Sequence, residues 1–404
     1  LSAVHGMLAA IGIIIMSKQL HILAGVTPLT LDGKAMVEPL ELLALLKTTI
    51  PNFFAHKEVA LIGLTSLTIV FGWPRLKVNF LKRIPAPLVV LVVSIFMAMA
   101  FGMKNTGNFK PLLTFDKGFF DILGVNVSFD GFQQTGTFIK YVIMFALVGS
   151  LEALLTVKAI DMMDPYKRKS NYNKDLMAVG FGNILAGIFG GLPMISEVAR
   201  SSANVNGGGR TRWSNFFHGI FIFIFLIFAV SFSNLIPMTA LAAMLIGVGW
   251  KLAHPKEFGH MFKIGADQLV VFLVTIVVTL MSDLLIGIGL GIITEIILHL
   301  FRGVGFKNLF KARYKVDHQV IHVEGAIVFT NYLKLQKSLQ TFDLSQQIHL
   351  DVTKCHFIDH NAIESIQQLQ AEFKFNDGML DVIGLQHFKN VHGSVHHSAT
   401  RKKK

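Results

Sequence analysis

Two polar stretches interrupt the apolar sequence of this 404-residue chain, and both carry side chains that could bind ions. In the first, Glu152 lies within the apolar run 138–158, and Thr156 follows one helical turn later on the same face. A carboxylate inside a membrane costs about 2.5–3.5 kcal/mol on insertion scales. A proton, a cation such as Na⁺, or the guanidinium of Arg200 would each offset that cost.

The second stretch, residues 190–204, predicts a break between two helices. Two glycines and Pro193 end the preceding apolar run, and a new helix is expected to begin near Ser196, whose hydroxyl is a natural N-cap. The N-terminus of a helix presents free N–H groups and about half a positive charge. Such a terminus, at mid-membrane and beside Arg200, predicts an anion site. Discontinuous helices form sites of this kind in transporters.

Structural roles stay open for the same residues. Glu152 and Arg200 could form an ion pair that only stabilises the fold, and Ser196 and Glu197 could serve only as capping residues. Three further acidic residues lie near the ends of the last apolar runs, where snorkelling or surface exposure is expected: Asp267, Asp283 and Glu295.

Other kinds of site have no counterpart in the sequence. No stretch resembles a P-loop, a zinc ligand set or a nucleophile triad. This argues against an ATP-driven pump and against an enzyme, and it predicts neither a catalytic residue nor a metal site. The single cysteine, Cys355, leaves no internal disulfide.

The elements that must position these residues are membrane spans. The chain is 52% hydrophobic and 15% charged, where a soluble protein carries roughly 25% charged residues, and its mean hydropathy is +0.55. The apolar residues fall in nine runs that are expected to cross a bilayer: 2–24, 58–73, 85–103, 138–158, 176–190, 214–236, 238–252, 267–282 and 284–302.

The net charge of +12 follows the positive-inside pattern and does not indicate nucleic-acid binding. Basic clusters alternate with mixed or uncharged loops, so the basic loops are expected to face the cytoplasm: 75–83, 167–174, 210–212 and 251–263. Basic and non-basic loops alternate between the two sides of the membrane along the whole chain only if the short segment 197–206 counts as a crossing. Residues 190–196 are its re-entrant lead-in. Such a half-helix is tolerated only where it lines a cavity or packs within protein.

After Arg302 the pattern becomes that of a soluble domain. Residues 303–315 form a basic juxtamembrane linker, and an α/β sheet domain is expected over 316–390. Its strands are expected at 319–323, 326–329, 347–352 and 380–385, and its helices at 331–341 and 362–373. The basic, His-rich tail 391–404 is expected to be solvated and disordered, with a metal site from His392, His396 and His397 as the alternative.

The motifs together resemble the SulP (sulfate permease) family of inorganic anion transporters. The resemblance rests on residues 83–88, 150–155, 180–183 with 190–193, 199–212 and 236–243. Residues 348–352 followed by 357–359 resemble the STAS domain that such transporters carry at the C-terminus. Where phosphorylatable STAS domains place a serine after Asp359, this chain has His360 and Asn361, so a packing, dimerisation or partner-binding role is expected instead of a phosphoswitch.

The resemblance implies a polytopic α-helical membrane protein with the inverted-repeat SulP-type fold, N-terminally truncated, plus a small α/β STAS-like domain. The transmembrane domain would span 1–302 and lack the family's first four helices, including the half-helix that opposes 197–206. The same resemblance implies a homodimer in the cytoplasmic (inner) membrane, with the C-terminal domain in the cytoplasm and available to a cytoplasmic partner.

The resemblance also implies roles for single residues. The family's anion pocket maps onto Ser196, Glu197, Val198, Ala199 and Arg200. Its coupling-ion position maps onto Glu152 and Thr156, where related bicarbonate carriers bind Na⁺ and other relatives use the carboxylate for a proton. Glu197 departs from the family pattern, because many members have a small or neutral residue there.

The expected function is secondary active transport of an inorganic anion, sulfate or bicarbonate, by H⁺ or Na⁺ symport, with no cofactor beyond the coupling ion. Two alternatives stay open: a passive anion channel on the same fold, and a non-transporting membrane scaffold that acts through the STAS-like domain.

Overall fold

The computed structural model describes the chain in two compact units. Leu1–Lys18, Leu29–Leu45 and Leu245–Lys404 form the first unit, and Gln19–Pro28 and Leu46–Met244 form the second. The described residues are all except 1, 27–35, 37, 52, 54–55, 77–83, 106–110, 114–123, 126, 167, 340, 391–398 and 402–404.

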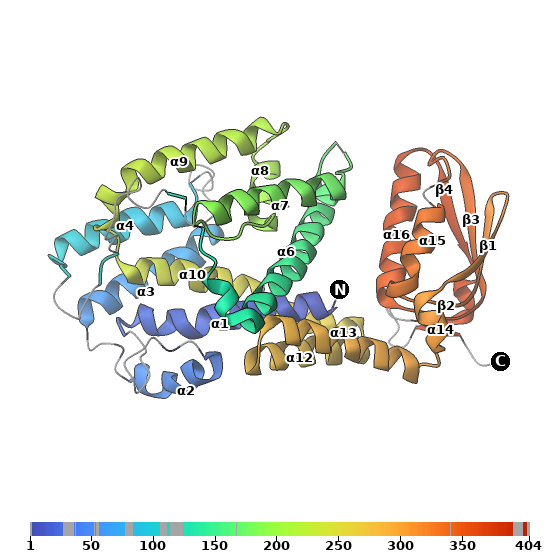
Figure 1. Cartoon of the computed structure of the whole chain (residues 1–404), viewed down its shortest axis with the longest axis horizontal. Helices are drawn as coiled ribbons and strands as arrows, with labels where there is room; N and C mark the ends of the chain where they lie inside the picture. Colours follow the sequence, from blue (N-terminus) through green and yellow to red (C-terminus); the bar gives the residue numbers. More distant parts are fainter. Residues whose placement is uncertain are drawn as a thin grey trace. The chain divides into compact units, whose positions relative to one another are not determined.

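Each of the nine predicted apolar runs folds as a helix (Figure 1). These helices are α1 (Ser2–Leu23), α3 (Lys57–Gly72), α4 (Ala86–Ala100), α6 (Thr135–Met163), α7 (Tyr172–Ile188), α9 (Trp213–Ser233), α10 (Met238–Leu252), α12 (Ala266–Met281) and α13 (Leu284–Phe301). Among the described residues, three helices are long and apolar enough to cross a membrane, judged by length and composition alone: α1, α6 and α13. Two further helices, α2 (Pro39–Thr49) and α11 (Pro255–Ile264), occupy stretches expected to be connections.

Glycines set the closest helix contacts of the first unit. A Cβ added at Gly12 of α1 would lie 2.5 Å from the carbonyl oxygen of Gly249 on α10, and one added at Gly249 would lie 2.7 Å from the oxygen of Gly12. A Cβ at Gly6 would meet the carbonyl oxygen of Phe272 on α12 at 2.7 Å. Small residues let helix backbones approach this closely in membrane proteins.

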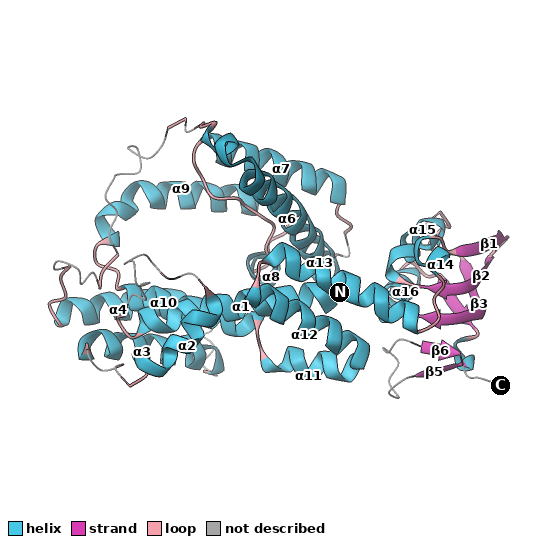
Figure 2. Ribbon diagram, turned by 60° about the horizontal axis from the view of Figure 1, so that its bottom comes forward, coloured by secondary structure: helices cyan, strands magenta, loops and turns pink. Residues whose placement is uncertain are grey.

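The C-terminal part of the first unit is an α/β domain (Figure 2). Its elements are α14 (Phe306–Phe310), β1 (Arg313–Asp317), β2 (Val320–Ile327), α15 (Phe329–Leu339), β3 (Gln347–Ile358), α16 (His360–Phe375), β4 (Met379–Ile383), β5 (Phe388–Asn390) and β6 (Ala399–Arg401). The sheet order is β1-β2-β3-β6-β5, with β4 also paired to β3. The pairs β2–β3 and β3–β4 are parallel, as two helical crossovers require.

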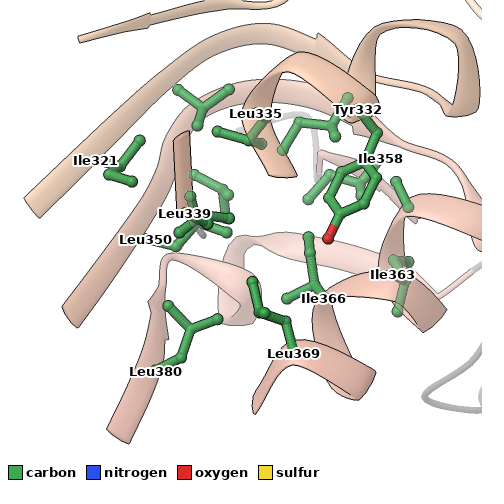
Figure 3. Close-up of a cluster of buried hydrophobic side chains, with 14 of the residues drawn as sticks. Ile321, Tyr332, Leu335, Leu339, Leu350, Ile358, Ile363, Ile366, Leu369 and Leu380 are labelled. Atoms are coloured by element: carbon green, nitrogen blue, oxygen red, sulfur yellow. The ribbon is translucent and has the colours of Figure 1, made fainter. Parts of the chain in front are cut away.

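Helices α15 and α16 cover one face of the sheet (Figure 1), and the core lies between them and the strands (Figure 3). Leu335 of α15, Leu350 of β3 and Phe373 of α16 are each fully buried in this cluster. Alternating apolar residues on β3 and helical spacing on α16 therefore produce the core that the sequence predicts.

The sheet differs from the predicted strands in five places. Strand β3 continues to Ile358, six residues beyond its expected end, and β5 was not expected. The two short strands expected around Glu324 and Gly325 are one strand, β2, whose register shifts on both sides of that pair. Gly325 has φ +88°, so a bulge replaces the predicted break. Strand β1 lies partly within the expected linker, and β6 lies within the expected disordered tail and pairs with β3 and β5. The three histidines of the alternative metal site fall outside the described residues.

Candidate functional site

The candidate site lies in the second unit, where α6, α7 and the short helix α8 (Val198–Asn206) come together (Figure 1). The predicted half-helix is thus present, nine residues long and preceded by the non-helical segment 191–197. Asn183 of α7 fixes this lead-in from one side. Its Nδ2 donates to the Met194 oxygen at 2.9 Å, and its Oδ1 accepts from the Met194 N–H at 2.6 Å.

Helix α6 holds the lead-in from the other side. The buried Thr156 hydroxyl donates to the carbonyl oxygen of Ser196 at 3.1 Å. Two turns earlier, a Cβ at Gly149 would lie 3.5 Å from the side chain of Ile195. Glu152 lies between these contacts on the same face of α6 and is partly buried. The predicted residues of α6 and of the lead-in are therefore neighbours in the fold.

Arg200 is paired with Glu197 at this site. Its Nε lies 2.5 Å from Glu197 Oε2, and the side chains are 67% and 38% exposed. Glu152 interacts electrostatically with Glu197. Arg200 therefore pairs with Glu197 of the lead-in and not with Glu152, as was considered from the sequence. An ion pair this exposed adds little stability.

Ser196 does not cap α8. The helix begins at Val198, and the Ser201 N–H donates to the Glu197 oxygen at 3.1 Å. The Ser196 hydroxyl instead donates to Asp175 Oδ2 at 3.4 Å. The predicted cap was wrong because the hydroxyl has a carboxylate partner on α7, which the local sequence does not reveal.

Asp175 is the site residue that sequence reasoning missed. It lies in the first turn of α7, directly after Lys174, which makes it look like a surface residue of a basic loop. Its neighbour Ser196 is 21 residues away, and no spacing rule connects them. The site therefore contains three carboxyl groups, of Glu152, Asp175 and Glu197, near one guanidinium.

This arrangement can bind an anion, but only with compensation. The first N–H groups of α8, at Val198 and Ala199, have no acceptor within the helix, and Arg200 adds a full positive charge. The three carboxyl groups, if all ionised, would leave a net negative charge that repels an anion. A cation or protons bound beside Glu152 would remove that repulsion. Among the described residues, no group of three or more His, Cys, Asp or Glu is placed to hold a metal ion.

Comparison with known proteins finds relatives that are named as anion transporters. It is 24% identical over 257 residues to the putative sulfate transporter YvdB of Bacillus subtilis, covering 60% of this chain and 48% of the relative. It is 28% identical over 316 residues to the putative sulfate transporter YbaR of the same organism, covering 76% and 63%. It is 25% identical over 301 residues to the bicarbonate transporter BicA of Picosynechococcus, covering 74% and 50%. The chain thus spans less than two thirds of the length of these relatives.

Solved structures show the same fold. The transmembrane domain of a cyanobacterial bicarbonate transporter, BicA, superposes with a TM-score of 0.59 at 20% identity, covering 71% of this chain and 69% of that one. The overall structure of SLC26A9 superposes with a TM-score of 0.63 at 14% identity, covering 94% and 64%.

The model of the sulfate permease family matches residues 1–275, which include α6, the lead-in and α8. The match covers well over half of the chain, and the fold agrees with it. The chain is a multi-pass membrane protein that belongs to the sulfate permease family.

Proposed function

We propose that the intact protein is a secondary active transporter of an inorganic anion, sulfate or bicarbonate, in the cytoplasmic membrane. The observation that carries this proposal is the N-terminus of α8, which follows an extended lead-in held by Thr156 of α6 and Asn183 of α7. Its neighbour Arg200 supplies a full positive charge. Relatives named as sulfate and bicarbonate transporters support the same substrate class.

In this proposal the anion meets the segment 196–200. The N–H groups of Val198 and Ala199 and the guanidinium of Arg200 donate to its oxygens, and the Ser196 backbone is kept in place by Thr156. Before the anion binds, the Glu197 carboxylate is paired with the Arg200 guanidinium. An incoming anion competes with Glu197 for that guanidinium, so Glu197 must turn away or take up a proton.

We propose Glu152 and Thr156 as the position of the coupling ion, either H⁺ or Na⁺. A cation at Glu152 lies on the face of α6 that contacts the lead-in, so it lowers the negative charge that the anion meets at Glu197. Cation binding and anion binding then favour each other, which is the thermodynamic requirement for symport.

A homodimer with a cytoplasmic, STAS-like C-terminal domain remains part of the proposal.

The alternatives to secondary active transport are a passive anion channel and a scaffold that acts through the C-terminal domain. A scaffold needs no arginine at the start of a half-helix inside the membrane, because such a charge is costly there.

The test is uptake of labelled sulfate and bicarbonate by proteoliposomes that contain the complete native polypeptide. Accumulation above the external concentration, driven by a proton or sodium gradient, is the expected result. Uptake that only equilibrates the anion would indicate the channel, and absence of uptake of any small anion would leave the scaffold.

A further inference from the structure

The junction between α13 and the C-terminal domain is a packed interface within the first unit. Ile296 of α13 packs against a buried cluster that joins the linker to the sheet. The cluster consists of Val304, Leu309, Ala326, Val328 and Phe357. Helix α14 lies beside the strands (Figure 1) and is tied to α15, since Asn331 Nδ2 donates to the Asn308 oxygen at 2.5 Å. The last membrane helix is thus connected firmly to the domain.

Ionisable side chains are buried in this apolar interface. Glu295, expected from the sequence to snorkel or be exposed, is only 3% exposed, and its Oε1 accepts from Asn361 Nδ2 at 3.0 Å. His299, one turn later, is also 3% exposed, and its Nε2 lies 3.9 Å from Asp359 Oδ2. The expectation for Glu295 was wrong because the C-terminal domain, and not water, covers the end of α13.

Asp359 lies at the centre of this interface with no exposed surface. Its Oδ1 accepts from the Ala362 N–H, capping α16, and its Oδ2 accepts from the Phe329 N–H at the start of α15, both at 2.6 Å. Burial raises the pKa of Asp359 to about 7, the two backbone N–H groups offset part of that rise, and the charge of Glu295 adds to it.

No lysine or arginine among the described residues faces Asp359; the positive charge that acts on it comes from the amino group at the start of the chain, and His299 can add to it only when protonated. Helix α13 contributes Glu295 and His299, and α16 itself contributes His360. Asp267 of α12 acts on His299, but it is paired with Arg302 at 2.8 Å. Farther along α16, Glu364 interacts with His5 of α1, which is itself 3.4 Å from Glu257 of α11 and also interacts with His260. Across the described parts of the chain, no lysine or arginine forms an ion pair with Glu295 or Asp359.

Two buried carboxylates that repel each other and have no lysine or arginine partner are strongly disfavoured, because each also loses its hydration. We infer that Glu295, His299 and Asp359 form a proton-binding site, and that the bound proton keeps the C-terminal domain seated on α13. Release of the proton leaves like charges buried, so the domain loosens from the last membrane helix. This site is separate from the proposed transport site and does not depend on it.

The direction of the pH effect follows from proton linkage. Burial raises the pKa of Asp359, and the charge of Glu295 on α13 adds to that rise only while the domain is seated, so the seated state binds more protons than the loosened state. Seating is therefore strongest on the acid side and weakens as the pH rises toward about 7. The ratio of loosened to seated states increases about tenfold for each unit by which seating raises the pKa.

Hydrogen exchange of the whole purified protein in nanodiscs tests this inference. Protection of residues 360–366, corrected for the intrinsic pH dependence of exchange, should fall about tenfold or more between pH 5 and pH 8. Glu295→Gln removes one charge while its amide oxygen still accepts from Asn361, so it should flatten that dependence. The matched control is Glu324→Gln, which removes a surface carboxylate paired with Lys354 and should leave the dependence unchanged.

A second variant tests the charge argument from the opposite side. Asn361→Asp places another carboxyl against Glu295 and should steepen the pH dependence, and Glu295→Gln in the same chain should reverse it. Wild-type protection that does not change with pH would overturn the inference, as would a Glu295→Gln variant with the full wild-type dependence. If Asn361→Asp does not fold, the Glu295→Gln result alone decides.

Discussion

In the proposed anion site, Glu197 sets the charge that an incoming anion meets at the start of α8. It holds Arg200 at 2.5 Å and interacts with Glu152. Removing its charge frees the guanidinium and removes a repulsion that acts twice as strongly on a dianion as on a monoanion. We predict that Glu197→Gln lowers the KM for sulfate about tenfold, equal to ~1.4 kcal/mol, and that for bicarbonate only about threefold.

The measurement is initial uptake in proteoliposomes as a function of anion concentration. Glu58→Gln, at an exposed acidic residue in the first turn of α3, is the control and should change neither KM. An unchanged KM for sulfate, or equal changes for the two anions, would contradict this role of Glu197.

Thr156 is the residue that joins α6 to the lead-in. Thr156→Val keeps the shape but removes the hydrogen bond to the Ser196 oxygen, leaving that acceptor without its donor at a cost of about 1–3 kcal/mol. We predict a lower unfolding temperature and a weaker dependence of uptake on the coupling cation. Thr68→Val is the matched control, since the Thr68 hydroxyl donates only within its own exposed turn of α3. Equal effects of the two substitutions would argue against a positioning role for Thr156.

The sequence pointed to Glu152 because its charge stands alone in an apolar run, and the structure brings Thr156, on the same face of α6, into contact with the lead-in. The sequence failed where the partner is distant in the chain. Asp175 contacts Ser196 across 21 residues, and Glu295 contacts Asn361 across 66. Whether such a carboxyl is exposed depends on which domain covers it, and local pattern carries no information about that.

Among the elements, the crossing of α1 and α10 depends most on small residues. Gly12→Ala would place a Cβ 2.5 Å from the Gly249 oxygen, so the helices must separate. We predict a loss of about 1–3 kcal/mol in stability, seen as a lower unfolding temperature in detergent. Gly289→Ala in α13 meets open space and should have no such effect. A Gly12→Ala variant as stable as the wild type would show that the two helices do not cross as described.

The core of the C-terminal domain offers an internal reporter, because Cys355, the single cysteine, is fully buried in it. Leu335→Ala should destabilise the domain by about 2–5 kcal/mol, since the buried side chain leaves a cavity. Labelling of the Cys355 thiol should then become at least about 30-fold faster. Leu333→Ala, two residues earlier and 63% exposed, is the control and should leave the labelling rate unchanged.

Helix positions were predictable because the apolar runs are bounded by charges, glycines or prolines, and all nine runs fold as helices. The short α8 was predictable from Gly190, Gly191 and Pro193, which prevent a continuous helix. Strand β1 was not predicted, because it is mostly exposed and its residues are polar or basic except for Tyr314 and Val316. Strand β6 was not predicted, because one of its pairing partners is β3, which lies about 40 residues earlier in the chain.

At the scale of the whole molecule, the proposals place two ion-binding regions in different units. The proposed transport site lies in the second unit, and the junction of α13 with the C-terminal domain lies in the first. Membership of the sulfate permease family accounts for the fold and for the half-helix. In the proposed site, Glu197 contributes to the choice of anion.

We propose above all that Arg200, in the first turn of α8, binds the transported anion. The most direct measurement compares gradient-driven accumulation of labelled sulfate and bicarbonate by wild-type, Arg200→Ala and Arg212→Ala proteins in proteoliposomes. Arg212 is exposed and directly precedes α9, so its loss should leave accumulation unchanged. We predict that Arg200→Ala abolishes accumulation of both anions while the protein remains folded. Undiminished accumulation by Arg200→Ala would contradict the account.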